Sequence, residues 1–204
     1  DAQESRGLGD VYKRQPQTIT VEGLTRRFGD FTAVDHIGFT VPQGKMTGFV
    51  GGNGAGKTTT MRMIMGVLSI TEGRVLWGDR PITAADQRSI GYMPEERGLY
   101  PKQKVADQLI YLGQLRGMTA KASRESVMTL LERLGLEERT EDTVESLSLG
   151  NQQRVQIAAA LMIEPAALIL DEPFSGLDPD AVDSMADLLR EHTARGVPVL
   201  FSSH

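Results

Sequence analysis

The chain contains 204 residues, of which 40% are hydrophobic, and this is enough to bury one sizeable core. Its formal net charge of −5 argues against a nucleic-acid binder that relies on overall positive charge, although a local basic patch stays open. The absence of Cys excludes disulfides and thiolate metal sites. No apolar run approaches the roughly 20 residues that a membrane-spanning helix needs. We therefore expect a chain that is soluble or attached to a membrane through another protein.

Residues 1–15, DAQESRGLGDVYKRQ, carry no apolar periodicity and no signal-peptide core. They resemble a translated sequencing adapter more than a protein segment, so we predict a disordered or non-native tail here. A regulatory tail is the alternative. The folded domain is predicted to cover residues 16–204.

Residues 16–92 are predicted to form a β-layer together with a phosphate-binding loop. Residues 18–21 and 37–41 alternate apolar and polar side chains with a period of two, as half-buried antiparallel strands do. Residues 73–79 indicate a further strand that ends in a turn. The segments of the β-layer would therefore flank the phosphate-binding loop in the sequence.

Residues 51–58 have the form G-x-x-x-x-G-K-T, between a predicted buried strand at 47–50 and a predicted helix at 59–68. Glycines allow successive backbone N–H groups to point into one concavity, and the helix N-terminus adds positive potential there. Lys57 can then reach the β- and γ-phosphates of a nucleotide, while the Thr58 hydroxyl can ligate Mg²⁺. The alternative, a glycine-rich turn with an accidental lysine, arises in on the order of one per cent of chains of this length. The predicted nucleotide-binding residues are Gly51, Gly52, Asn53, Gly54, Ala55, Gly56, Lys57, Thr58 and Thr59.

Residues 93–151 are predicted to form an α-helical subdomain. Val105, Leu109 and Leu112 recur at helical spacing. A second apolar stripe runs from Val127 to Leu134, and Gly135 is a plausible stop for that helix. Taken alone, these are ordinary packing helices.

Residues 152–204 are predicted to form the core that follows this subdomain. The continuous apolar run at 166–170 fits a central parallel strand that is covered on both faces. It ends at Asp171 and Glu172, and acidic residues at the carboxyl end of such a strand lie where open α/β sheets bind ligands. Residues 180–194 indicate a helix and residues 197–204 a last strand.

Further motifs resemble those of the ATP-binding cassette (ABC) ATPases and follow the family's order. Residues 147–154, LSLGNQQR, are similar to the signature motif, and residues 168–173, LILDEP, are similar to Walker B. Residues 92–95 match the Q-loop, residues 175–178 match the D-loop, and His204 falls on the switch histidine. The resemblance covers residues 17–204, and the phosphate loop and signature together make it specific.

The resemblance implies an α/β fold: a P-loop NTPase core with a parallel sheet, an antiparallel β-layer and an α-helical subdomain, truncated at the C-terminus. It also implies ATP and Mg²⁺ as cofactors. Because the chain stops at His204, we expect its last strand to have one uncovered side, and the isolated chain to be a poor ATPase of low solubility.

The resemblance also assigns roles to single residues. Phe28 would stack on adenine, with a place in the core as its alternative, and Asp178 of the D-loop would contact the nucleotide site. Glu172 would polarise the attacking water and His204 would sense the γ-phosphate, although a lone His is more often structural. Mg²⁺ would be held by Thr58, Asp171 and Glu95. Ser148 and Gly150 would contact ATP that is bound to a second subunit.

Three positions depart from the commoner family pattern. Gly52 stands where many relatives have Pro, which should only loosen the loop. Leu149 and Asn151 replace Gly and Gln of the LSGGQ form, but the LSxGNQQR variety occurs in bacterial exporter ATPases. Glu95 replaces the Q-loop Gln; alternatively it points to solvent, and Glu96 or Arg97 contacts the membrane subunit.

The resemblance predicts the ATP-binding and hydrolysing subunit of an ABC transporter, most simply an exporter, at the cytoplasmic face of the cell membrane. Its partners would be a second ATP-binding domain, as a homodimer, and integral membrane permease subunits, with no nucleic acid. The alternatives are a soluble ABC ATPase that acts on ribosomes or DNA, and a small nucleotide kinase, which the signature and D-loop disfavour. The transported substrate is left open, because the membrane subunits select it.

Overall fold

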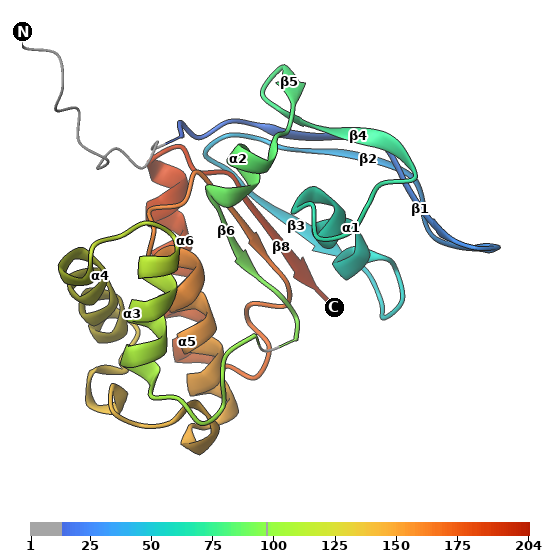
Figure 1. The fold of residues 1–204 in the computed structure, drawn as a ribbon. Coiled ribbons are helices and arrows are strands. Elements are labelled where there is room, and N and C mark those ends of the chain that lie inside the picture. The colour runs from blue at the N-terminus through green and yellow to red at the C-terminus, as the bar shows by residue number, and fades with distance from the viewer. Residues whose placement is uncertain (1–13, 97) are drawn as a thin grey trace, which may run out of the picture.

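The computed structural model describes residues 14–96 and 98–204, which form two β-sheets with helices around them (Figure 1). The predicted tail therefore lies outside the described residues except for Arg14 and Gln15. The first sheet is antiparallel and has the order β2-β1-β4-β5. Its strands are β1 (Ile19–Phe28), β2 (Phe31–Val41), β4 (Glu72–Trp77) and β5 (Arg80–Pro81). The β1–β2 register pairs Ile19 with Val41, which confirms the antiparallel strands predicted from the period-two alternation.

The second sheet is parallel and has the order β3-β8-β7-β6. Its strands are β3 (Met46–Val50), β6 (Ile90–Met93), β7 (Ala167–Leu170) and β8 (Val199–Ser203). β8 pairs with β3 on one side and β7 on the other, so the expectation of an uncovered last strand is wrong. Helix α6 (Pro179–Ala194) leads from β7 to β8 and returns the chain to the position between β7 and β3.

β3 is an edge strand of the parallel sheet among the described residues. The prediction of a buried strand at 47–50 is therefore wrong in part: Gly48 and Val50 are exposed, with Val50 at 71%. Successive side chains point to opposite faces of a strand, so Gly48 and Val50 lie on the same face of β3, and this face is exposed at the end of the strand.

Alternate residues of β7 face two separate cores, as a strand with a period of two requires. Leu168 and Leu170 pack in a core with α5 (Leu149–Leu161), α6 and the helical subdomain. Ala167 and Ile169 pack in a second core with α1 (Lys57–Ile64) and the antiparallel sheet. All four side chains are fully buried, which confirms the prediction of a central strand that is covered on both faces.

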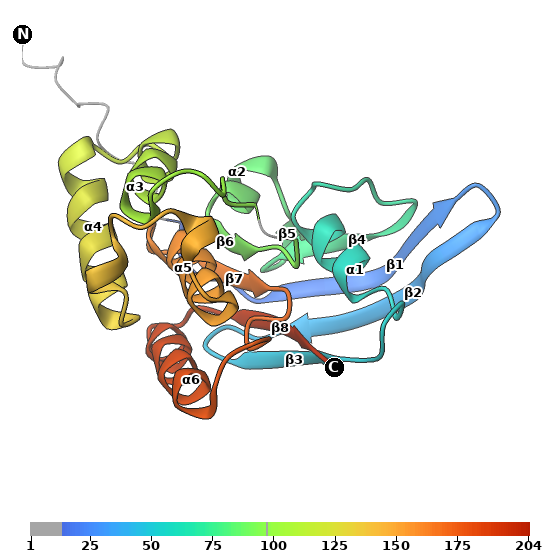
Figure 2. The same ribbon diagram turned by 90° about the horizontal axis from the view of Figure 1, so that it is seen from below.

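The helical subdomain lies on the side of the parallel sheet away from the β1–β2 hairpin (Figure 2). It contains α3 (Val105–Leu115), α4 (Ala120–Arg133) and the single-turn helices at Glu137–Arg139 and Val144–Ser146. As predicted, α4 ends just before Gly135, whose φ of +66° is favourable for glycine. None of the helices in the described part of the chain is both long and apolar enough to cross a membrane.

α1 is shorter than the helix predicted at 59–68, because it ends at Ile64. The short helix α2 (Ala84–Arg88) follows later in the chain, between β5 and β6. Gly66 adopts a φ of +70°, and the backbone N–H groups of Val67 and Leu68 both donate to the carbonyl of Arg62. These bonds end the helix here. The predicted helix was longer because the apolar spacing continues past the point where the backbone leaves the helix.

α5 is buried along most of its length, although Leu149 at its start is 61% exposed. It approaches β6 so closely that a Cβ at Gly91 would overlap the carbonyl oxygen of Ala160. Gln152, Gln153 and Gln156 are also buried, and their burial was not predicted.

We predict that Gln156→Met stabilises the protein. Gln156 is 5% exposed, and neither its Oε1 nor its Nε2 has a hydrogen-bond partner among the described residues. Met has a similar shape and removes the cost of the unpaired amide, so the free energy of unfolding should rise by about 1–3 kcal/mol. Urea denaturation measures this difference.

Gln108→Met is the matched control for this prediction. Gln108 is also buried, but its Oε1 accepts a hydrogen bond from the Tyr100 backbone N–H at 3.1 Å. Its replacement should lower the free energy of unfolding, because that N–H loses its partner. Destabilisation of similar size in both variants would show that the Gln156 amide is satisfied.

Candidate functional site

The carboxyl ends of the four parallel strands bring the predicted site segments to one edge of the sheet. β3 continues into the phosphate loop, and β7 ends directly before Asp171 and Glu172. β8 ends before His204, and β6 ends two residues before Glu95. Figure 1 shows the C-terminus at the end of β8, beside β3 and α1. The site therefore gathers segments that are more than a hundred residues apart in the chain.

The phosphate loop is held against the strands on either side of it. The Gly51 N–H donates to the carbonyl of Ser203 on β8 at 3.3 Å. Gly56 adopts a φ of +80°, and a Cβ there would lie 2.9 Å from the carbonyl oxygen of Ala33 on β2. The glycine is therefore required both by the backbone conformation and by the close approach of β2.

Lys57 and the start of α1 line this loop. The Lys57 side chain is 7% exposed, and its Nζ donates to the carbonyl oxygens of Gly51 and Gly52. The first turn of α1 has no side-chain cap and no acidic residue. Its backbone N–H groups therefore have no side-chain partner, and the positive end of the helix is suited to a phosphate group.

Asp171 and Glu172 present carboxylate oxygens at the end of β7. Asp171 is 1% exposed; its Oδ1 accepts from the Ser202 hydroxyl at 2.6 Å, and its Oδ2 has no partner among the described residues. The Glu172 Oε1 lies 3.4 Å from Nε2 of His204 and 3.9 Å from Nζ of Lys57, and no described residue donates a hydrogen bond to it. Burial raises the pKa of the Tyr92 phenol on β6, and the nearby Asp171 carboxylate raises it further, so this phenol stays protonated.

The backbone of Glu172 is strained, with a φ of +51° that side chains other than glycine rarely adopt. Such a conformation costs of order 1–3 kcal/mol and persists only where neighbours hold it. The Glu172 N–H donates to the Ser202 hydroxyl at 2.8 Å, and its carbonyl accepts from Nε2 of Gln153 at 2.8 Å. Gln153 lies within the signature motif and Ser202 within the last strand, and neither was predicted to act on the site.

The oxygen donors of this site fit Mg²⁺. The Thr58 hydroxyl donates to Oε2 of Glu95 at 3.1 Å, so Glu95 points toward the phosphate loop. Arg97, part of the alternative reading of this segment, lies outside the described residues. Hydroxyl and carboxylate oxygens are hard ligands, and the buried Asp171 Oδ2 is free to bind a cation. Within the described ranges, no three His, Cys, Asp or Glu side chains form a metal site by themselves, so phosphate oxygens and water would have to complete the coordination.

The remaining predicted residues lie apart from this group. Ser148 caps α5 and accepts from the Asn151 N–H at 3.3 Å, while Asp178 caps α6 and accepts from the Ala181 N–H at 2.9 Å. In the described part of the chain, no hydrogen bond or ion pair joins Ser148 or Asp178 to the phosphate loop. A Cβ on Gly150 would lie 3.2 Å from the carbonyl of Gly176, so the signature packs against the loop before α6.

Phe28 is 46% exposed at the end of β1, so its alternative place in the core is wrong. The guanidinium of Arg26 lies 4.4 Å from the centre of its ring. The ring is thus partly open to solvent and has a cation over one of its faces.

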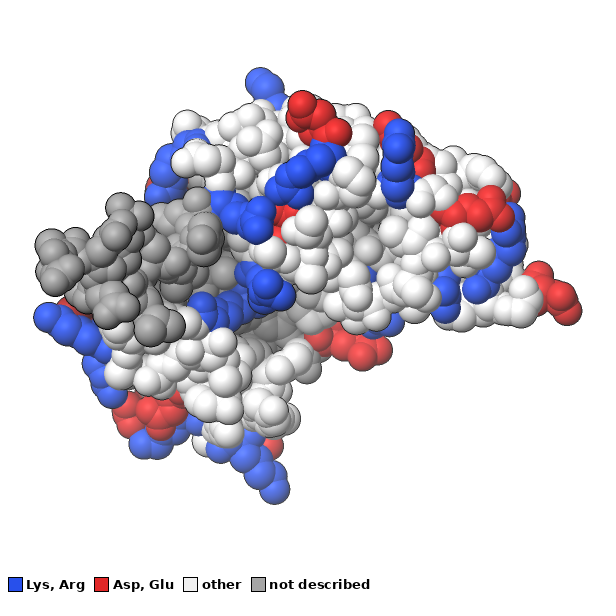
Figure 3. Space-filling model, turned by 45° about the horizontal axis from the view of Figure 1, so that its top comes forward, with Lys and Arg blue, Asp and Glu red and all other residues white. Residues whose placement is uncertain are grey.

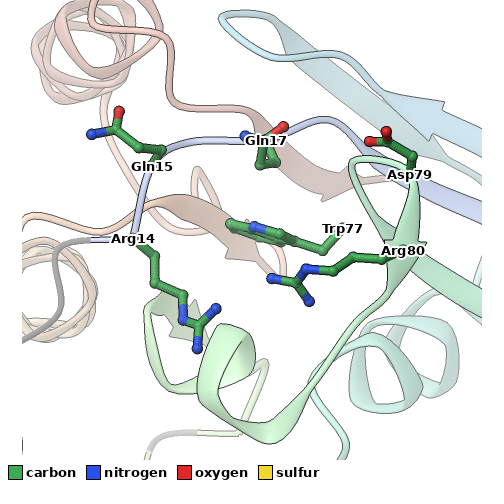
Figure 4. Close-up of a pocket in the computed structure, with 6 residues that line it drawn as sticks. All are labelled: Arg14, Gln15, Gln17, Trp77, Asp79 and Arg80. Atoms are coloured by element: carbon green, nitrogen blue, oxygen red, sulfur yellow. The ribbon is translucent and has the colours of Figure 1, made fainter.

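A cavity of about 430 Å³ lies elsewhere, beside β4 and β5 (Figure 4). Figure 3 shows the molecule with its top turned forward, and Lys and Arg side chains gather near the middle of the face seen there. Arg80 pairs bidentately with the buried Asp86, and this hydrogen bonding holds the pKa of that carboxyl well below its usual range. Arg14 lies 2.6 Å from the same carboxylate. None of the predicted nucleotide-site residues is among the cavity's lining residues, which are Arg14, Gln15, Gln17, Trp77, Asp79 and Arg80.

The two sheets, the helical subdomain and the glycine loop between β3 and α1 define the chain as an α/β protein with the ABC ATPase fold. A solved ATP-binding subunit of an ABC transporter superposes with a TM-score of 0.81 at 30% identity, over 91% of this chain and 79% of that one. The ABC transporter family matches residues 34–175. The chain therefore belongs to the ABC transporter family of ATP-binding proteins.

Two relatives illustrate this membership. An ABC transporter ATP-binding protein of Bacillus subtilis (strain 168), YhaQ, is 48% identical over 186 residues, 91% of this chain. The Nod factor export ATP-binding protein I of Burkholderia lata is 37% identical over 190 residues, again 91% of this chain. The chain spans 62% of the length of each of these relatives.

We predict that Lys57→Ala weakens ATP binding. The buried ammonium group would make charge-assisted contacts with phosphate oxygens, which contribute roughly 1.5–3 kcal/mol. The dissociation constant for ATP should therefore rise by about tenfold or more, as measured by calorimetry. Lys45→Ala, which removes an exposed lysine just before β3, is the control and should leave the affinity unchanged. Equal affinity in both variants would contradict the assignment of the phosphate loop.

Proposed function

We propose that this chain is the ATP-binding and hydrolysing part of an ABC transporter that works as an exporter. The observation that carries the proposal is the meeting of four strand ends at one site. There the phosphate loop, Glu95, Asp171–Glu172 and His204 lie within reach of one another. The family membership supports ATP as the nucleotide.

Binding of ATP would rest on the loop and α1. The backbone N–H groups around Gly56 and the Lys57 ammonium would contact the β- and γ-phosphates, and Phe28 would stack on adenine. Thr58, Asp171 and Glu95 would hold Mg²⁺, either directly or through water. When bound with ATP, the ion would neutralise charge on the phosphate oxygens.

Hydrolysis would use Glu172 as the base. Its Oε1 accepts no hydrogen bond from described residues, so it is free to accept one from the attacking water and then to take its proton. His204, whose Nε2 lies 3.4 Å from that oxygen, would contact the γ-phosphate. The strained Glu172 backbone would fix where this oxygen lies before the nucleotide arrives.

A second copy of the domain would complete the site. Ser148 caps the signature helix α5 and Gly150 lies in its first turn. α5 packs in the core on one face of β7, whereas α1, which follows the phosphate loop, packs in the core on the other face. We infer that Ser148 and Gly150 contact ATP held by a partner copy in a head-to-tail homodimer. The dimer would act on integral membrane permease subunits at the cytoplasmic face of the membrane. Export as the direction draws support from the named role of the Nod factor relative.

We predict that Glu172→Gln keeps ATP affinity but lowers the hydrolysis rate by about 10²–10⁴-fold. The amide cannot take a proton from water, whereas the phosphate contacts stay in place. ATP-dependent dimers should then accumulate and elute early in size-exclusion chromatography with ATP and Mg²⁺. Glu138→Gln, an exposed change in the helical subdomain, is the control. Elution of the Glu172 variant only as a monomer would count against the dimer mechanism.

We predict that Glu95→Gln keeps ATPase activity but needs several-fold more Mg²⁺ for the half-maximal rate. The carboxylate of Glu95 accepts from Thr58, and a charged oxygen binds Mg²⁺ more strongly than the neutral amide oxygen of Gln. A Mg²⁺ titration of the rate at fixed ATP measures the difference. Glu96→Gln removes the same charge from the next residue and should not change the titration. Identical half-saturation in wild type and Glu95→Gln would remove Glu95 from the metal site.

A further inference from the structure

Ser202 occupies the second-last position of β8 and is completely buried. It lies 31 residues from Asp171 in sequence, but β8 runs beside β7 and brings the two side chains into contact. The hydroxyl makes two hydrogen bonds, and both go to the pair of acidic residues at the end of β7.

The first bond orients the carboxylate of Asp171. The Ser202 Oγ donates to Oδ1 at 2.6 Å, within the range of a charge-assisted hydrogen bond. It occupies one oxygen and leaves Oδ2 without a partner among the described residues, inside a fully buried side chain. An unpaired buried carboxylate oxygen is costly, and a cation there would remove the cost.

The second bond holds the backbone of Glu172. The same Oγ accepts from the Glu172 N–H at 2.8 Å, at the residue whose φ of +51° is strained. A hydroxyl carries one donor and two acceptor lone pairs, so both bonds form at once. One side chain therefore controls the direction of Asp171 and the conformation from which the Glu172 carboxylate projects.

We propose that Ser202 is a positioning residue for the divalent cation and for the catalytic base. Its bond to Oδ1 leaves Oδ2 of Asp171 as the oxygen that would bind the cation, and its bond to the Glu172 N–H holds the backbone from which that side chain would reach the attacking water. This inference rests on the proposed function, because it requires that Asp171 binds Mg²⁺ together with ATP. A Ser that only satisfied buried polar groups would affect stability alone.

The experiment compares affinity for a non-hydrolysable ATP analogue in Mg²⁺ and in EDTA, by calorimetry on the full chain. We define the Mg²⁺ advantage as the dissociation constant in EDTA divided by the dissociation constant in Mg²⁺. Both constants are measured on the same variant, so a general loss of stability does not change their ratio. Ser202→Ala removes both hydrogen bonds, and Ser202→Thr restores the hydroxyl. Removal of a residue that orients a metal ligand typically costs 10- to 100-fold in metal affinity. We therefore expect the Mg²⁺ advantage of Ser202→Ala to fall by roughly 10-fold or more, with its affinity in EDTA unchanged.

Ser123→Ala is the matched structural control. Ser123 is also completely buried, and its hydroxyl donates to the carbonyl of Ile110 at 2.7 Å within the helical subdomain. Its removal should lower the melting temperature and leave the Mg²⁺ advantage at the wild-type value. Thermal melting of all four proteins shows that each variant is folded at the temperature of the titration.

The outcomes separate the inference from the function on which it rests. A loss of the Mg²⁺ advantage in Ser202→Ala, with retention in Ser202→Thr and Ser123→Ala, supports the inference. If Ser202→Ala keeps the wild-type Mg²⁺ advantage, the inference is overturned and the proposed function is left intact. An equal loss in Ser123→Ala would also overturn it, because the effect would then be one of stability. Absence of any Mg²⁺ advantage in the wild type would overturn both.

Discussion

The arrangement of the site depends on one constraint, the insertion of β8 between β3 and β7 in the parallel sheet. Parallel strands end at the same edge, so this order places the phosphate loop, the acidic pair and His204 side by side. The same insertion carries Ser202 to the carboxylate of Asp171 and ties the start of the loop to the carbonyl of Ser203. If β8 lay at the edge instead, it would have only one of these two neighbours, so both sets of contacts could not form at once.

The buried polar groups of the site are unevenly satisfied, and this unevenness indicates what the site binds. Ser202 bonds to the backbone N–H of Glu172 and to one carboxylate oxygen of Asp171, and Gln153 bonds to the carbonyl of Glu172. Two carboxylate oxygens, one on each acidic residue, have no hydrogen bond from described residues. Protein interiors rarely leave such oxygens unpaired, and a bound cation or water molecule would satisfy these two. Unlike the unpaired amide of Gln156, they lie at the carboxyl end of β7, where open α/β sheets bind ligands. Backbone strain and polar burial thus occur together at two oxygens that accept no hydrogen bond from described residues, although Lys57 and His204 lie within ion-pair distance of the one on Glu172.

The helical subdomain and the core are joined through α5. This helix begins within the signature and packs in one core with the helices of the subdomain. It also lies so close to β6 that a methyl group on Gly91 would not fit. From its first half, Gln153 reaches the carbonyl of Glu172, so a shift of the signature helix would act directly on the strained residue. Because interiors are closely packed, such a shift would not be absorbed by empty space.

Local patterns in the sequence determined the elements whose signals lie within a few residues of each other. The form G-x-x-x-x-G-K-T located the phosphate loop, the alternation at 18–21 and 37–41 predicted antiparallel strands within β1 and β2, and the apolar run at 166–170 predicted the central strand. The tertiary structure alone decided the strand order, the exposure of Val50 at the edge, and the contacts of Ser202 and Gln153 with residues 31 and 19 positions away. A buried Ser in a strand has the same local pattern whatever it faces. Which neighbour it meets depends on how distant strands are ordered, and the period of one strand carries no record of that order.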